Sequence, residues 1–141
     1  MFTVSLCIFR GTPLDTAISR PTGILLTRGP FTSYMTVLGT LGVFAFSERL
    51  DYDPRKDKML AGAVTLGELP RDVGYEAVKV VVQTVRIREK DPEFSCQTWC
   101  AEVLERFVEL GWMTGERREM GVEGMVGWML RGEDEGRLAE V

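Results

Sequence analysis

The sequence predicts an α+β fold, in which an antiparallel sheet of about five strands is covered by two or three helices. Two observations predict this class. Apolar and polar residues alternate in the first half of the chain, and apolar residues recur at helical spacing in the second half. The length of 141 residues fits a single domain, because domains commonly run to about 100–150 residues. We expect it to be strand-rich over residues 1–68 and helix-rich over 70–131, with a frayed tail over 132–141.

Five segments of the first half have the composition of β-strands. The first shows the alternation most clearly, with an apolar residue at every second position from Phe2 to Ile8. The others are apolar, aromatic or β-branched and are separated by glycine, proline or charged residues. The expected strands are residues 2–8, 24–27, 31–38, 42–49 and 59–66, with a hairpin turn over Gly39-Thr40-Leu41-Gly42 that uses glycine at positive φ.

Three segments of the second half have helical periodicity. Residues 95–110 form the clearest helix, with Ser95 as N-cap and Gly111 just after the end. A helix over 73–85 is less well supported, because its many valines favour a strand. A last amphipathic helix is expected over 120–130, although three glycines in it disfavour helix. The methionine and tryptophan residues of this last third suit either core packing or an adaptable apolar cavity over the start of the 95–110 helix.

The composition excludes several classes of function. The chain has no histidine, so it has no Ser-His or Cys-His dyad and no His-ligated metal, and we expect no metal site. Phosphate-binding glycine motifs are absent, so no cofactor is expected, and the net charge of −4 argues against nucleic acid. No apolar run approaches the roughly 18 residues that cross a membrane. Cys7, Cys96 and Cys100 are an odd number without CxxC spacing, which indicates reduced thiols in a cytoplasmic protein.

Cys96 is the candidate reactive residue. As the first residue after the N-cap Ser95, it would lie at the positive end of the helix dipole, beside unpaired backbone N–H groups. Both effects favour the thiolate, so we expect a lowered pKa and a nucleophilic sulfur. The alternative is that Cys96 is a small buried residue, as free cysteines often are. Cys7 and Cys100 are expected to be structural.

The stretch Ser95-Cys96-Gln97-Thr98-Trp99, followed by an amphipathic helix that ends in glycine, resembles the Asn-Cys-Gln-x-Trp element of small uncharacterised fungal proteins. Those proteins are similar to circularly permuted members of the papain and NlpC/P60 superfamily of thiol hydrolases, in which the strands carrying histidine precede the cysteine helix. The stretch from Gly39 to Phe46 is similar to a Gly-Thr-x-Gly-x-Phe turn of the same group. The resemblance covers residues 22–111 and implies a permuted papain-like fold.

Both histidines of that group are missing here. The corresponding stretches are Thr22-Gly23 and Met35-Thr36. Papain-type catalysis needs an imidazole to take the thiol proton and return it to the leaving group. The resemblance therefore implies a thiol-hydrolase scaffold that has lost its original chemistry.

Three functions remain open from the sequence. The first is a repurposed scaffold that binds an apolar small molecule and catalyses a cyclisation, condensation or isomerisation in fungal specialised metabolism. The second is a cysteine hydrolase or acyl transferase that uses Cys96 with a carboxylate base. The third is a non-catalytic binding or scaffold protein, and a homodimer is left open. For the first function the candidate catalytic residues are Cys96, Tyr34 and Thr36, and the candidate substrate-binding residues are Arg20, Arg28, Trp99 and Gln97.

Overall fold

The computed structural model describes residues 1–11, 15–16, 19–40, 43–88 and 90–139. Their secondary structure confirms the predicted α+β class, and each observed strand overlaps a predicted one. The strands are β1 (Thr3–Phe9), β2 (Thr22–Arg28), β3 (Phe31–Thr40), β4 (Val43–Leu50) and β5 (Leu60–Glu68). The helices are α1 (Tyr75–Thr84), α2 (Cys96–Glu109) and α3 (Gly115–Ala139), with a short 3-10 helix, η2 (Pro54–Lys56).

The five strands form one open sheet in the order β4-β3-β2-β1-β5, and every neighbouring pair is antiparallel. Strand β4 lies at one edge of the sheet and β5 lies at the other, so the chain crosses the sheet between these two strands. The charged loop that contains η2 makes this crossing. The predicted hairpin turn between β3 and β4 includes residues 41 and 42, which lie outside the described residues.

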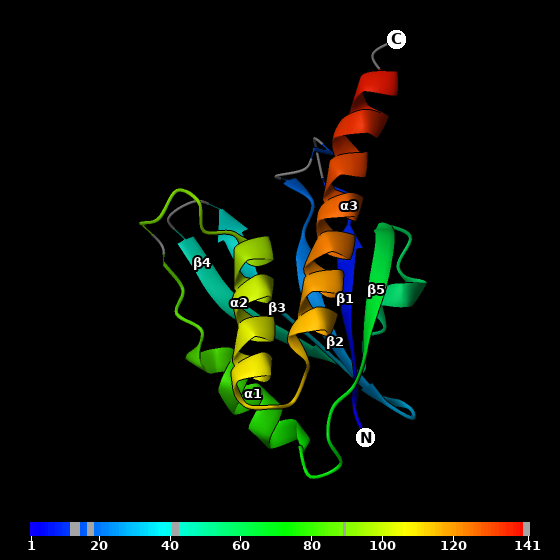
Figure 1. Ribbon diagram of the computed structural model, residues 1–141. Helices are drawn as coiled ribbons and strands as arrows, with labels where there is room; N and C mark the ends of the chain where they lie inside the picture. The colour runs from blue at the N-terminus through cyan, green and yellow to red at the C-terminus, as the bar shows by residue number, and fades with distance from the viewer. Residues whose placement is uncertain (12–14, 17–18, 41–42, 89, 140–141) are drawn as a thin grey trace.

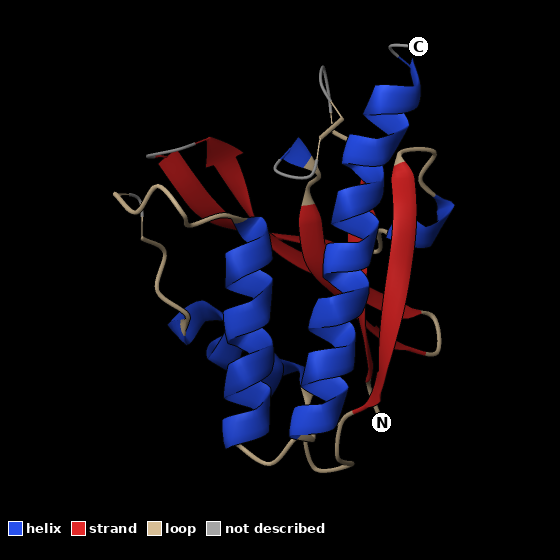
Figure 2. Ribbon diagram, turned by 45° about the horizontal axis from the view of Figure 1, so that its top comes forward, coloured by secondary structure: helices blue, strands red, loops and turns tan. Residues whose placement is uncertain are grey.

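Side chains of a strand alternate between the two faces of a sheet, and here both faces carry apolar clusters. On one face Leu6, Ile24 and Met35 are fully buried. Helices α2 and α3 lie side by side over this face, α2 on β2 and β3 and α3 on β5 and β1 (Figure 1, Figure 2). The opposite face carries a smaller cluster of Cys7, Phe9, Leu25 and Tyr34, against which Tyr52 and Leu60 pack.

Helix α2 confirms the predictions made for residues 95–110. Ser95 is the N-cap, and its hydroxyl oxygen accepts a hydrogen bond from the backbone N–H of Thr98 at 3.3 Å. Gly111 follows the helix with a φ of 76°, a conformation that glycine adopts without steric cost. The apolar stripe is buried, and the Trp99 ring lies 6.2 Å from that of Phe46 on β4. This packing holds the first turn of α2 over the sheet.

Helix α3 is longer than the sequence predicts. Its backbone is helical from Gly115 to Ala139, where we expected a helix over 120–130 and a frayed tail from residue 132. The glycines of this segment have low helix propensity, which led us to expect a shorter helix. In the structure Gly121 and Gly124 face side chains of β5, and a Cβ atom at either position would crowd them. The missing side chains therefore let α3 approach the sheet, and this packing offsets their low helix propensity.

We predict opposite effects for two glycine-to-alanine variants. In Gly62→Ala the new methyl group on β5 would overlap the Trp128 ring of α3, so the free energy of unfolding should decrease by about 1–3 kcal/mol. In Gly127→Ala the methyl group meets nothing within 4 Å, and the helix should gain up to about 1 kcal/mol of intrinsic propensity. Urea unfolding measures both changes. Equal stabilities would contradict the close packing of α3 on β5.

Candidate functional site

The candidate site lies where the first turn of α2 meets the beginning of β2. Cys96 is the first residue of α2, and its side chain is half-buried. The backbone N–H of Thr22, the first residue of β2, donates a hydrogen bond to Cys96 Sγ at 3.3 Å. The predicted position of the thiol at the helix start is therefore confirmed, and the end of a strand is held against it.

A groove of about 1010 Å³ opens beside this thiol, and we call it the Cys96 groove. Its volume is at the upper end of the range for small-molecule sites, about 300–1,000 Å³. Strands β3 and β4, the segment before α2, and α3 supply its walls. The apolar side chains that line it are Val37, Leu38, Phe44, Phe94 and Met129.

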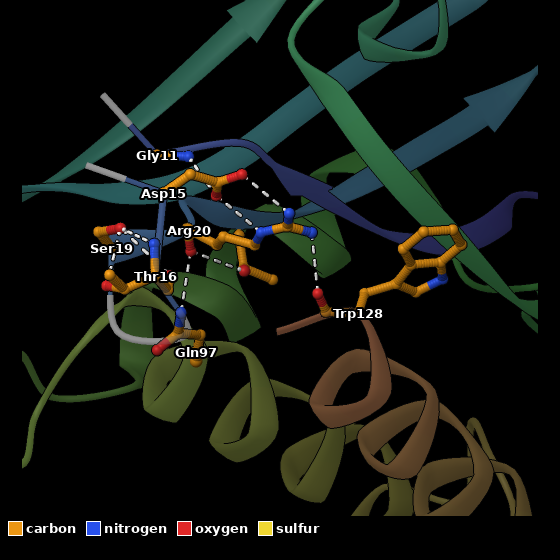
Figure 3. A network of polar contacts seen from close by, with 8 residues as sticks. Gly11, Asp15, Thr16, Ser19, Arg20, Gln97 and Trp128 are labelled. Carbon is orange, nitrogen blue, oxygen red and sulfur yellow. Dashed lines mark hydrogen bonds and ion pairs between the residues drawn. The ribbon is translucent and has the colours of Figure 1, made fainter. Parts of the chain in front are cut away.

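Arg20 is a fully buried residue of the same groove, and three segments of the chain meet at it (Figure 3). Its Nε and Nη2 donate hydrogen bonds to the two carboxylate oxygens of Asp15, at 2.8 and 2.9 Å. Its Nη1 donates to the backbone carbonyl of Trp128 in α3 at 2.9 Å. The carbonyl of Arg20 in turn accepts a hydrogen bond from Gln97 Nε2 at 2.9 Å. Arg20 therefore links the loop before β2 to both α2 and α3.

The other polar side chains of the Cys96 groove are also hydrogen-bonded within the chain, except the exposed carboxylate of Glu93. Ser95 Oγ donates to Gln97 Oε1 at 3.2 Å, and Thr98 Oγ1 donates to the backbone carbonyl of Glu93 at 3.0 Å. Every fully buried side-chain nitrogen or oxygen of the described residues has a hydrogen-bond partner. What the groove offers to a ligand is therefore mainly apolar contact.

The prediction of a lowered pKa for Cys96 is wrong. Burial removes water from around the sulfur and raises the pKa of this thiol above its ordinary value of 9.0. Hydrogen bonds from the N–H groups of Thr22, Gln97 and Cys96 itself act in the opposite direction and are outweighed. At neutral pH the group is a neutral thiol. The sequence identified the favourable helix end, but the depth of burial depends on the tertiary structure.

Of the predicted substrate-binding residues, the structure places Arg20 and Gln97 in the Cys96 groove and the others elsewhere. Arg20 was predicted to bind the substrate, and its guanidinium instead holds the carboxylate of Asp15. Trp99 is buried in the core beneath α2. Arg28 lies at the other end of β2, where its Cζ is 4.5 Å from the centre of the Phe2 ring.

Tyr34 and Thr36, predicted to act with Cys96, project from the opposite face of the sheet. Both line a separate pocket there, and Tyr34 belongs to the smaller apolar cluster. Thr36 keeps an indirect link to the thiol, because its Oγ1 donates to the backbone carbonyl of Thr22 at 2.7 Å. The structure does not bring Tyr34 and Cys96 into one site.

Sequence reasoning missed most of the apolar walls of the groove. The rings of Phe44 and Phe94 meet edge to face with centroids 5.5 Å apart. Phe94 directly precedes the N-cap, a position where apolar residues often pack against the helix start, and this signal could have identified it. Met129 is the one residue of the predicted methionine and tryptophan group that lines the groove.

Comparison of the chain with protein-family models, with curated proteins and with solved structures gives no match in any of the three. No helix in the described part of the chain is both long and apolar enough to cross a membrane. Among the described residues, no three His, Cys, Asp or Glu side chains are grouped so that they could hold a metal ion. The function is therefore argued from the geometry of the site.

We predict that Cys96 reacts slowly with iodoacetamide at neutral pH. In a Cys7→Ala, Cys100→Ala variant, the alkylation rate should still be increasing where an ordinary thiol has levelled off, because burial raises the pKa of the remaining thiol. Mass spectrometry after timed alkylation at a series of pH values measures this profile. The same variant unfolded in urea is the control, and its rate should level off at a lower pH than that of the folded protein. A native rate that already levels off below pH 7 would mean that the helix end outweighs burial.

The pair of Arg20 and Asp15 should make the fold sensitive to acid. The hydrogen bonds from Arg20 hold the pKa of Asp15 below its ordinary value of 3.8. The pair therefore contributes its full stabilisation above about pH 4 and loses it as the pH decreases through the lower, folded-state pKa. Asp15→Asn leaves a buried guanidinium without its counter-charge, so unfolding free energy should decrease by about 3 kcal/mol at pH 7. Its stability should also vary less with pH in the acid range.

Asp53→Asn is a matched control for this prediction. Asp53 pairs with Arg55 through the same two guanidinium nitrogens, and its Nε–Oδ1 distance is also 2.8 Å. The Arg55 side chain is 54% exposed, so this variant should lose less than about 1 kcal/mol. Chemical denaturation at several pH values compares the two variants, and equal losses would contradict the importance of burial at Arg20.

Proposed function

We propose that the protein binds a small apolar molecule in the Cys96 groove. This proposal rests on the different surroundings of the polar and the apolar side chains that line the groove. Apart from the exposed carboxylate of Glu93, its polar side chains are hydrogen-bonded within the chain, and side chains such as Leu38, Phe44 and Met129 form its walls. A ligand without formal charge gives up little hydration on entering such a site and gains apolar contact.

We also propose that the scaffold is a repurposed relative of the permuted papain-like group. An antiparallel sheet precedes a helix that carries cysteine at its first position and packs across the strands. In this resemblance Thr22 corresponds to one of the missing histidines, and the backbone N–H of Thr22 donates a hydrogen bond to the Cys96 sulfur. A histidine in place of Thr22 would lie beside the thiol, whereas the threonine hydroxyl is no base at neutral pH. These observations support the resemblance at two positions, Cys96 and Thr22.

A neutral thiol in an apolar groove suits ligand binding and proton donation better than acyl transfer. The thiolate is the nucleophilic form, and burial disfavours it at Cys96. A reaction in this groove would be a non-hydrolytic step, such as the cyclisation or isomerisation expected in fungal specialised metabolism. In that step Cys96 would donate a hydrogen bond or a proton to the bound molecule.

Nile red, a neutral dye whose fluorescence increases in apolar surroundings, tests the binding proposal. Met129 lines the groove, so Met129→Trp fills part of it and should weaken dye binding about tenfold, or roughly 1.4 kcal/mol. Met120→Trp is the matched control, because Met120 is 68% exposed on the same helix and outside the groove. Equal binding by the two variants, or no fluorescence increase with the native chain, would contradict the proposal.

A Cys96→Ala variant separates binding from hydrolase chemistry. It should retain Nile red binding, because Cys96 contributes only a small part of the groove wall. A burst of nitrophenol release from an activated ester that disappears in Cys96→Ala would favour the cysteine hydrolase instead.

A further inference from the structure

A second cavity, of about 380 Å³, lies on the face of the sheet away from α2 and α3. We call it the back-face pocket. Strands β1, β3 and β4 and the loop between β4 and β5 supply most of its lining. It shares Pro21 and Leu38 with the Cys96 groove, and the remaining walls are different. The residues that matter to its chemistry are Phe9, Tyr34, Ser47, Arg49, Tyr52 and Met59.

Aromatic rings give this pocket a fixed apolar frame. The Tyr34 ring meets that of Phe9 edge to face at 5.7 Å and that of Tyr52 at 6.0 Å. The same ring lies against Gly23 of β2, so closely that a Cβ atom there would overlap it. Tyr34 is therefore held in one position by its neighbours.

The hydroxyl of Tyr34 has no hydrogen-bond partner among the described residues. The residue is 6% exposed. No fully buried side-chain oxygen of the described residues lacks a partner, so this hydroxyl is reached from the pocket that Tyr34 lines. Burial raises the pKa of Tyr34 above its ordinary value of 10.0, and the hydroxyl remains a protonated donor at neutral pH.

Two further hydrogen-bond donors lie close to Tyr34. The register of β3 and β4 places Arg49 directly opposite Tyr34, and Ser47 opposite Thr36, on the same face of the sheet. The guanidinium of Arg49 lies over the Tyr52 ring, with its Cζ 3.8 Å from the ring centre. Neither Arg49 nor Ser47 has an acceptor among the described residues. The pocket is therefore lined by three donors that have no acceptor among the described residues, with the Tyr34 hydroxyl over Gly23 of β2 and the other two on β4.

The acidic groups near the pocket already have partners. Asp57 accepts hydrogen bonds from the Tyr52 hydroxyl at 2.6 Å and from the backbone N–H of Met59 at 2.8 Å. Asp15 is held by Arg20. A second guanidinium, that of Arg10, also lines the pocket. Arg49 and Arg10 are exposed, so water can solvate their guanidinium groups, and a ligand that replaced this water would be favoured by a negative charge beside them.

We propose that the back-face pocket binds a small organic carboxylate with a flat apolar body. The carboxylate accepts hydrogen bonds from Arg49, Ser47 and the Tyr34 hydroxyl, and the apolar body lies against Phe9 and Met59. The volume is near the lower end of the range for ligand sites, about 300–1,000 Å³, so it suits a molecule of one or two rings. This site is independent of the neutral ligand proposed for the Cys96 groove.

Calorimetric titration with 2-naphthoate, and with the neutral 2-naphthamide as matched probe, tests this site. The native chain should bind the carboxylate more tightly than the amide. Arg49→Gln should weaken naphthoate binding about tenfold and leave amide binding unchanged. Tyr34→Phe, which removes only the unpartnered hydroxyl, should weaken naphthoate binding severalfold. Arg71→Gln, at an exposed position after β5, is the charge-matched control and should bind both probes like the native chain.

Two cavity-filling variants distinguish this site from the Cys96 groove. Ser47→Phe should abolish naphthoate binding and leave Nile red binding intact, and Met129→Trp should do the opposite. Naphthoate should shift the amide resonances of β3 and β4. Equal affinity for acid and amide, absence of binding, the same loss in Arg71→Gln as in Arg49→Gln, or resonance shifts confined to α2 would each overturn the proposal.

Discussion

The buried guanidinium of Arg20 holds together segments that lie far apart in the sequence. Asp15 in the loop before β2 compensates its charge, and the carbonyl of Trp128 in α3 accepts a further hydrogen bond from it (Figure 3). Its own carbonyl is bound by Gln97 in α2. A guanidinium buried without such partners would cost several kcal/mol, so the loop and the two helices depend on one another. Because residues of all three segments line the Cys96 groove, this interaction also positions the groove's walls.

The open sheet creates two apolar environments of different chemistry. Helices α2 and α3 cover one face, and the loop between β4 and β5 covers part of the other. A cavity remains on each face, and Leu38 at the end of β3 borders both. In the Cys96 groove the polar side chains other than the exposed Glu93 have partners within the chain. In the back-face pocket Tyr34 and Arg49 have donors that find no acceptor among the described residues. The first arrangement favours a neutral ligand and the second an anionic one.

The strands and α2 could be predicted because their local signals agree with the tertiary structure. The alternation in β1, the N-cap Ser95 and the terminal Gly111 act within a few residues. The length of α3 could not be predicted, because glycines such as Gly121 disfavour a helix locally. Only the tertiary structure shows that they allow close packing on β5. Alternation also shows that Tyr34 and Thr36 lie on the same face of the sheet. It does not show which face the helices cover, so the predicted site combined residues from both faces.

Burial decides the chemistry of the groups that the sequence made candidates for catalysis. The pKa values of Cys96 and Tyr34 are both raised by burial, and that of Cys7 is raised to about 12. A helix end can favour a thiolate by a modest amount, but loss of hydration acts on the charged form directly and is the larger effect at Cys96. At neutral pH these groups are therefore uncharged hydrogen-bond donors rather than nucleophiles. Protonated thiols and phenols can donate hydrogen bonds, and such groups line both cavities, Cys96 in the groove and Tyr34 in the back-face pocket.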